Sequence, residues 1–153
     1  MANTYTQIYI HIVFSVQGRL NLIKGEWKDE LYKYITGIIK GQEQKLYIIN
    51  GMPDHTHILL SLKPHIAISD LIRDIKANSS RFINEKSWTR GKFQWQEGFG
   101  AFSYGRSQLE DVVEYIKNQE EHHRKKTFKE EYLEFLKKFQ VPYDEKYLFT
   151  WIE

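Results

Sequence analysis

The stretch KLYIINGMPDHTHILLSL, residues 45–62, predicts a β-hairpin. An Asn-Gly pair at Asn50 and Gly51 supplies turn chemistry between two apolar runs. The second run contains His55 and His57, which leave the sheet on the same face because successive strand side chains point to opposite faces. The hairpin therefore presents a pair of imidazoles side by side.

The elements around this hairpin predict an α+β fold. The first six follow the order β-α-β-β-α-β, which is the ferredoxin-like pattern of an antiparallel sheet with helices on one face. The first and third strands then lie at the centre of the sheet, and two further helices follow. We expect the whole chain, residues 1–153, to form one domain. The expected strands are 5–16, 45–50, 55–62 and one or two within 91–104, and the expected helices are 26–41, 69–86, 108–123 and 127–139.

The histidine pair has two interpretations. Two imidazoles on one face of a central strand can share a divalent metal ion. They can equally be ordinary polar residues on the open face of a half-buried sheet, as the alternation of residues 5–16 indicates for the first strand. The triplet His55-Thr56-His57 does not by itself decide between them.

A helix sixty residues later carries Tyr115 and Gln119, which lie on one helical face at i,i+4 spacing. His122 falls on the same stripe, whereas His123 is interpreted as a residue that favours the helix C-terminus. A tyrosine that attacks a phosphodiester needs a cation on the scissile phosphate. Mg²⁺ prefers oxygen ligands, so a site with two imidazoles favours Mn²⁺.

Composition limits the class of protein. The chain has 153 residues, 41% of them hydrophobic and 27% charged, with a formal net charge of +2. The absence of cysteine excludes disulfides, zinc–thiolate sites and thiol nucleophiles. No run of about 18 apolar residues predicts a membrane span, and no signal segment is evident, so we expect a cytoplasmic protein with no membrane partner.

Positive charge gathers in the segment 73–92, which has six basic residues against two acidic ones. Such a segment is either a solvated surface or a contact for a polyanion, and the charge alone leaves both open. The basic residues are Arg73, Lys76, Arg81, Lys86, Arg90 and Lys92.

Three blocks of sequence together resemble the single-tyrosine HUH transposases of small bacterial insertion sequences, including their repeat-associated relatives. The blocks are MPDHTHILL at 52–60, WQEGFGAFS at 95–103 and YIKNQEEHH at 115–123. The resemblance implies that His55 and His57 bind the metal, that Tyr115 is the nucleophile and that Gln119 is the third ligand. Thr56 departs from the family, which usually has a large hydrophobic residue there.

The resemblance also implies the reaction and the partners. Such transposases cut and rejoin single-stranded DNA beside hairpins through a 5′-phosphotyrosine intermediate, with Mg²⁺ or Mn²⁺ as cofactor. They work as homodimers in which the tyrosine helix of one subunit completes the histidine site of the other. The alternatives are a captured, non-mobile relative that binds hairpins, and a non-catalytic nucleic-acid-binding module. The residues expected to contact DNA are Arg73, Lys76, Arg81, Arg90 and Lys92.

Overall fold

A computed structural model of the chain describes residues 4–144. Within these residues no helix is long and apolar enough to cross a membrane. The elements in chain order are β1 (Tyr9–Ser15), a 3₁₀ helix (Gln17–Arg19), α1 (Gly25–Gly41), β2 (Lys45–Met52), β3 (His55–Ser61), α2 (Ile68–Lys86), β4 (Gly100–Tyr104), a second 3₁₀ helix (Arg106–Gln108), α3 (Leu109–Lys117), α4 (Gln119–His123) and α5 (Phe128–Lys138).

The four strands form one antiparallel sheet in the order β2-β3-β1-β4. The first and third strands therefore lie at the centre, as the ferredoxin-like order predicts, and the α+β class is confirmed. His57 on β3 pairs with Val13 on β1 and with Asn50 on β2. The histidine pair thus sits on a strand whose geometry is fixed by hydrogen-bonded neighbours on both sides.

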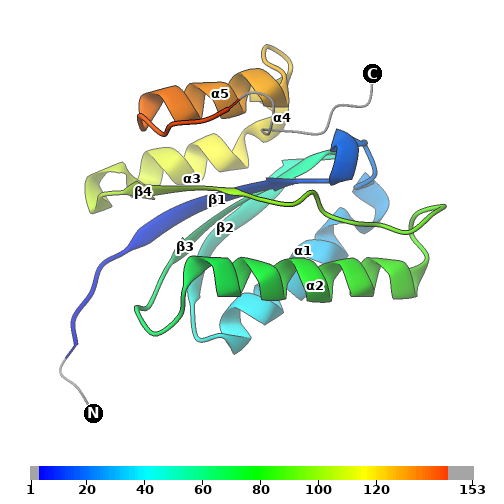
Figure 1. The fold of residues 1–153 in the computed structure, drawn as a ribbon, viewed down its shortest axis with the longest axis horizontal. Helices are drawn as coiled ribbons and strands as arrows, with labels where there is room; N and C mark the ends of the chain where they lie inside the picture. The colour runs from blue at the N-terminus through cyan, green and yellow to red at the C-terminus, as the bar shows by residue number, and fades with distance from the viewer. Residues whose placement is uncertain (1–3, 145–153) are drawn as a thin grey trace.

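Helices cover both faces of the sheet (Figure 1), with α1 and α2 on one side and α3, α4 and α5 on the other. We call the second side the histidine face because His55 and His57 point to it. All seven residues of β1 are consequently buried, and the expected half-buried strand is wrong. The C-terminal helices, which follow the ferredoxin-like elements, account for the difference.

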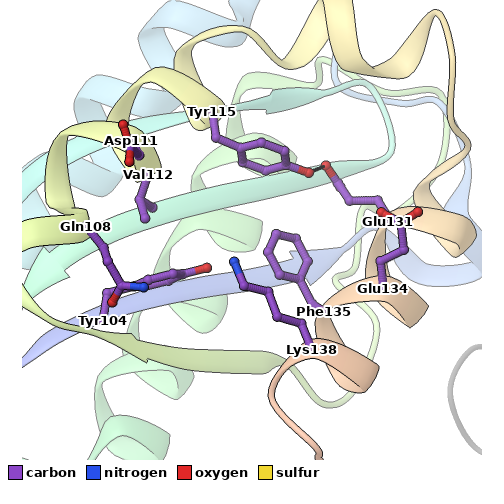
Figure 2. Close-up of a pocket in the computed structure, with 9 residues that line it drawn as sticks. All are labelled: Tyr104, Gln108, Asp111, Val112, Tyr115, Glu131, Glu134, Phe135 and Lys138. Atoms are coloured by element: carbon purple, nitrogen blue, oxygen red, sulfur yellow. Dashed lines mark hydrogen bonds between the residues drawn. The ribbon is translucent and has the colours of Figure 1, made fainter.

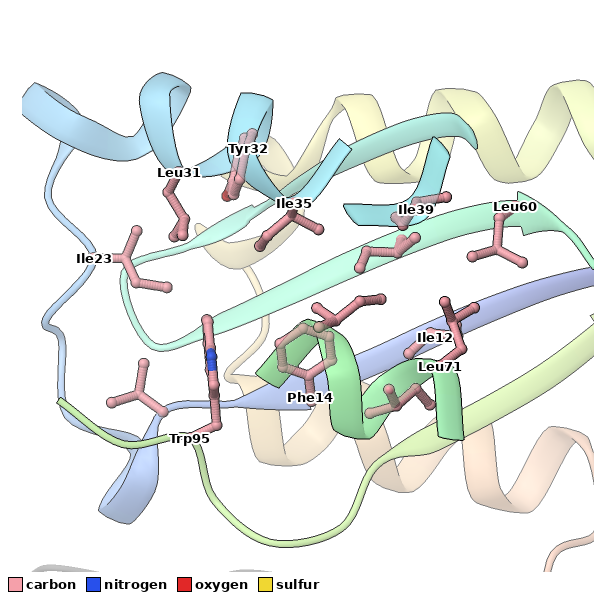
Figure 3. Close-up of a cluster of buried hydrophobic side chains, with 14 of the residues drawn as sticks. Ile12, Phe14, Ile23, Leu31, Tyr32, Ile35, Ile39, Leu60, Leu71 and Trp95 are labelled. Carbon is pink, nitrogen blue, oxygen red and sulfur yellow. The ribbon is translucent and has the colours of Figure 1, made fainter. Parts of the chain in front are cut away.

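The larger hydrophobic core lies between the sheet and the pair α1 and α2 (Figure 3). Strand residues such as Ile12 and Phe14 meet helix residues such as Leu31, Ile35 and Leu71 there. Full burial of each such side chain contributes roughly 1.5–3 kcal/mol to folding. The histidine face holds two smaller clusters, one between the sheet and α5 and one between the sheet and α3.

The segment 91–104 was expected to hold one or two strands, and it holds one. Residues 91–104 contain one strand, β4, and an isolated bridge between Val16 and Trp95. Trp95 is buried, and its indole N–H donates to the Ser79 hydroxyl at 2.9 Å. The segment is therefore held to α2 by side chains and to the end of β1 by backbone hydrogen bonds, from Gln96 N to Ser15 O and from Gln17 N to Gln94 O.

Thr56 faces the core under α1 and α2 and is fully buried. Among the described residues its hydroxyl has no hydrogen-bond partner. A buried hydroxyl without a partner carries a desolvation penalty, whereas valine has the same shape without that polar group.

We predict that Thr56→Val raises the free energy of unfolding by about 1 kcal/mol, because it removes an unsatisfied hydroxyl. Urea titration followed by circular dichroism measures the change. Thr36→Val is the matched control, since the Thr36 hydroxyl donates to the Tyr32 carbonyl at 2.7 Å and its loss should not stabilise the protein. A lower stability for Thr56→Val would contradict the view that the Thr56 hydroxyl is buried without a hydrogen-bond partner.

Candidate active site

The two histidines of β3 are fully buried on the histidine face. The Nδ1 atom of His55 lies 2.6 Å from Oδ1 of Asp54, and Nδ1 of His57 lies 2.8 Å from Nε2 of His11 on β1. These contacts leave the Nε2 atoms of both rings directed toward a third group. The interpretation of the pair as ordinary polar residues on an open face is therefore wrong.

That third group is the carboxylate of Glu131 on α5. Its Oε1 atom lies 3.1 Å from Nε2 of His57, 3.6 Å from Nε2 of His55 and 3.3 Å from Nε2 of His123. One ligand atom from each of these four residues lies within 4.8 Å of all the others. Three imidazoles and one carboxylate therefore converge on one point, a donor set that could hold a metal ion.

Glu131 was not predicted from the sequence, and His123 was assigned to the helix end. A signal for Glu131 was present, because it falls on the apolar stripe of α5 with Phe128, Tyr132 and Leu136. Thr127 begins that helix with the expected capping box, in which its hydroxyl accepts from the Glu130 amide. A carboxylate on a buried helical stripe needs a polar partner, and the histidines provide it.

Gln119, the expected third ligand, begins α4 and is fully buried. Its Oε1 atom lies 3.3 Å from Nε2 of His55 and 3.1 Å from Nε2 of His123. Its amide nitrogen lies 3.3 Å from Oε2 of Glu131. The glutamine is thus at the edge of the same cluster, with its carbonyl oxygen toward the imidazoles.

Tyr115 reaches the cluster from α3. Figure 2 shows its phenol pointing across to Glu131, to which the hydroxyl donates a hydrogen bond at Oε2. The Tyr115 ring is 6.2 Å from the ring of His57 and stacks on His122 at 4.5 Å. A cavity of about 310 Å³ opens beside it, lined also by Phe135 and Lys138. Tyrosine and histidines therefore meet within one chain.

The helix that carries Tyr115 is shorter than expected. The predicted helix 108–123 is interrupted at Asn118, with φ −97° and ψ 31°, so that Tyr115 and Gln119 lie on separate helices. The side-chain amide of Asn50 on β2 donates to the carbonyls of Ile116 and Lys117, at 3.0 and 3.1 Å. A continuous helix would use those carbonyls for the amides four residues later.

Electrostatics favour the protonation states that metal binding needs at His57 and Glu131. At His123 burial acts to lower the pKa, but the hydrogen bond and charge of Glu131 raise it above its usual value. Burial lowers the pKa of His57, and it lowers that of His11 well below its usual value. Burial acts to raise the pKa of Glu131, but the adjacent imidazoles, His57 first, hold it far below its usual range. Burial, followed by the Glu131 charge, raises the pKa of Tyr115. At neutral pH the carboxylate of Glu131 is therefore ionised, His57 is neutral and the phenol of Tyr115 is protonated.

Four of the five residues expected to contact DNA line a second cavity, of about 970 Å³, between α2 and residues 92–99. The four are Arg73, Lys76, Arg81 and Lys92. The fifth, Arg90, is exposed but does not line the cavity. The Lys76 ammonium donates to the carbonyls of Gln96 and Gly98, and burial lowers its pKa to about 8. Lys76 therefore also fixes one wall of this cavity.

Comparison with known proteins gives consistent matches. A family model described as "Transposase IS200 like" matches residues 4–119. The ISDra2 transposase TnpA of Deinococcus radiodurans is 27% identical over 120 residues, covering 74% of this chain and 84% of the relative. An IS200 transposase of Salmonella typhimurium is 23% identical over 124 residues, covering 78% and 81%.

Two solved structures share the fold. A putative transposase from Deinococcus radiodurans superposes with a TM-score of 0.62 at 21% identity, covering 78% of this chain and 95% of that one. A REP-associated tyrosine transposase bound to a REP hairpin superposes with a TM-score of 0.58 at 16% identity, covering 77% of this chain and 70% of that one. The family match ends at Gln119, so His123 and Glu131 lie beyond it.

We predict that Asn50→Ala lowers the free energy of unfolding by about 1–2 kcal/mol, because two carbonyls at the end of α3 lose their donor. Amide hydrogen exchange in residues 118–123 should also accelerate. Asn118→Ala is the matched control, since no side-chain hydrogen bond of Asn118 is found within residues 4–144. Unchanged stability and exchange in Asn50→Ala would show that the contact does not hold the helix end.

Proposed function

The chain belongs to the IS200-like transposase family, and we propose that it cleaves and rejoins single-stranded DNA through Tyr115. The observation that carries the proposal is the shared carboxylate of Glu131. Its Oε2 accepts from the Tyr115 hydroxyl while its Oε1 lies 3.1 Å from Nε2 of His57. One side chain thus joins the nucleophile to the histidine cluster. We treat residues 1–153 as the single domain that performs this reaction.

The proposed step is an in-line attack of the Tyr115 oxygen on the scissile phosphorus. A bond forms between that oxygen and phosphorus, and the bond from phosphorus to the 3′ oxygen breaks. The released oxygen takes up a proton from water, so that a 5′-phosphotyrosine and a free 3′-hydroxyl result. The phenol is protonated beforehand because its pKa is raised, and Glu131 is the nearest acceptor for its proton. Attack by a 3′-hydroxyl reverses the step and rejoins the strand.

His55, His57 and Gln119 are the proposed ligands of the divalent metal, and the geometry adds His123 and Glu131 as candidates. The residues fit such an ion, because Asp54 and His11 contact the Nδ1 atoms and leave the Nε2 atoms to coordinate. When bound, the ion would neutralise charge developing on the phosphate oxygens. Three imidazoles favour Mn²⁺ over Mg²⁺, which prefers oxygen ligands.

A DNA hairpin is the proposed partner, and the neighbour solved with a REP hairpin supports this choice. The cavity lined by Arg73, Arg81 and Lys92 is the candidate contact, together with Lys76 and Arg90. Guanidinium and ammonium groups there would meet phosphates and position the hairpin without reading its bases. The homodimer with shared sites stays a prediction. An exchange of α3 between subunits would have to break the hydrogen bond between Tyr115 and Glu131 of the same chain.

We predict that Tyr115→Phe forms no covalent adduct with a labelled single-stranded hairpin in the presence of Mn²⁺, because the attacking oxygen is missing. Its affinity for the hairpin should stay within about twofold of the unaltered protein. Denaturing gels measure the adduct and fluorescence anisotropy measures binding. A denaturation-resistant adduct in Tyr115→Phe would exclude Tyr115 as the nucleophile.

We predict that Glu131→Gln weakens Mn²⁺ binding by about 10–100-fold, the usual cost of disturbing the surroundings of a metal site. Calorimetric titration or Mn²⁺ paramagnetic resonance measures the affinity without any reaction. Glu130→Gln is the matched control, since Glu130 is exposed, lies one residue away and can be replaced by glutamine in the capping box. Equal affinity in both variants would remove Glu131 from the metal site.

A further inference from the structure

A second positively charged hollow lies at the end of the sheet where the turn between β2 and β3 is found. It is enclosed by three segments far apart in the sequence, namely residues 19–24, 52–54 and 123–130, and has a volume of about 600 Å³. In Figure 1 the connection between α4 and α5 lies at the same end as the 3₁₀ helix that follows β1. We call it the basic groove after its cationic residues, which are Arg19, Lys24, Arg124, Lys125 and Lys126.

The positive charge of the basic groove is not balanced by its acids. The two acidic lining residues, Asp54 and Glu130, are engaged with His55 and with the Thr127 cap respectively. Lys24 and Lys125 are exposed, and their ammonium groups have no ion-pair or hydrogen-bond partner within residues 4–144. These two groups remain available to an anionic ligand.

The two other cations of the 124–126 run form ion pairs with carboxylates that remain exposed to solvent. Arg124 lies 3.2 Å from Glu121, with side chains 73% and 62% exposed, and Lys126 lies 2.7 Å from Glu134. Such exposed pairs are worth little in water, so a phosphate can compete for the cations.

The basic groove leads to the histidine cluster. His123 lines the groove and also places its Nε2 3.3 Å from Oε1 of Glu131. It is the only one of the four cluster residues that is partly exposed. Asp54 lines the groove as well and contacts Nδ1 of His55. A strand lying in the groove would therefore pass directly beside the candidate ligands.

We propose that the basic groove binds the sugar–phosphate backbone of the single DNA strand next to the cleavage point, chiefly through Lys24 and Lys125. This inference rests on the proposed function, because the reaction class identifies the polyanion as DNA. Cations from two segments far apart in the sequence suit several successive phosphates better than one small anion. The run 124–126 lies outside the family match, whereas Lys24 lies within it, so the groove combines residues from both parts of the chain.

The test uses the double variant Lys24→Gln/Lys125→Gln of the full chain and a fluorescent oligothymidylate, which cannot form a hairpin. Anisotropy titrations with EDTA at several salt concentrations give binding without cleavage. Loss of two phosphate contacts should reduce the slope of log affinity against log salt by about 1.4, since each contact on a single strand contributes about 0.7. Affinity at 0.1 M salt should then fall about 25-fold if the curves converge at 1 M.

The matched control is Lys33→Gln/Lys40→Gln, which removes two exposed charges from α1 and should leave the slope unchanged. An unchanged slope in the groove variant, or an equal loss in the control, would overturn the proposal. Adduct formation with a hairpin is measured separately. A reduced slope without any adduct would support the groove and refute the proposed cleavage. An adduct with an unchanged slope would refute the groove and support the proposed cleavage.

Discussion

The carboxylate of Glu131 is almost fully buried, and it is surrounded by His55, His57, His123 and the hydroxyl of Tyr115. An isolated ionised carboxylate in such a place would cost far more than a domain can tolerate. Each of its oxygens has polar partners instead, and these come from β3, α3 and α4. The contacts that form the site are thus the same contacts that require α5 to lie over the sheet.

This requirement explains why the sheet is buried on both faces. A ferredoxin-like unit covers only one face, and the other would expose His11, His55 and His57 together with apolar neighbours. The helices α3 and α5 bury that face and supply the groups that the histidines need. The family match covers the sheet and the tyrosine helix, while the carboxylate comes from the part that follows. The chain therefore combines a shared scaffold with a C-terminal helix that completes the cluster.

Much of this arrangement could be predicted from local patterns. Strand alternation placed His55 and His57 on one face, and helical spacing placed Tyr115 near Gln119. The interruption at Asn118 could not be predicted, because it depends on Asn50, which is 66 residues from Ile116. Glu131 was missed for a similar reason. Its position on the apolar stripe of α5 was visible in the sequence, but its histidine partners come from the opposite side of an interface that spacing alone does not reveal.

We propose that Tyr115 is the residue that becomes joined to DNA. Trypsin should release residues 107–117 as one peptide, SQLEDVVEYIK, in which Tyr115 is the only tyrosine. The most direct measurement is mass spectrometry of this peptide after incubation of the protein with Mn²⁺ and a single-stranded hairpin, followed by nuclease digestion. We predict that this peptide carries a nucleotide 5′-phosphate on Tyr115. A nucleotide on any other peptide would contradict it.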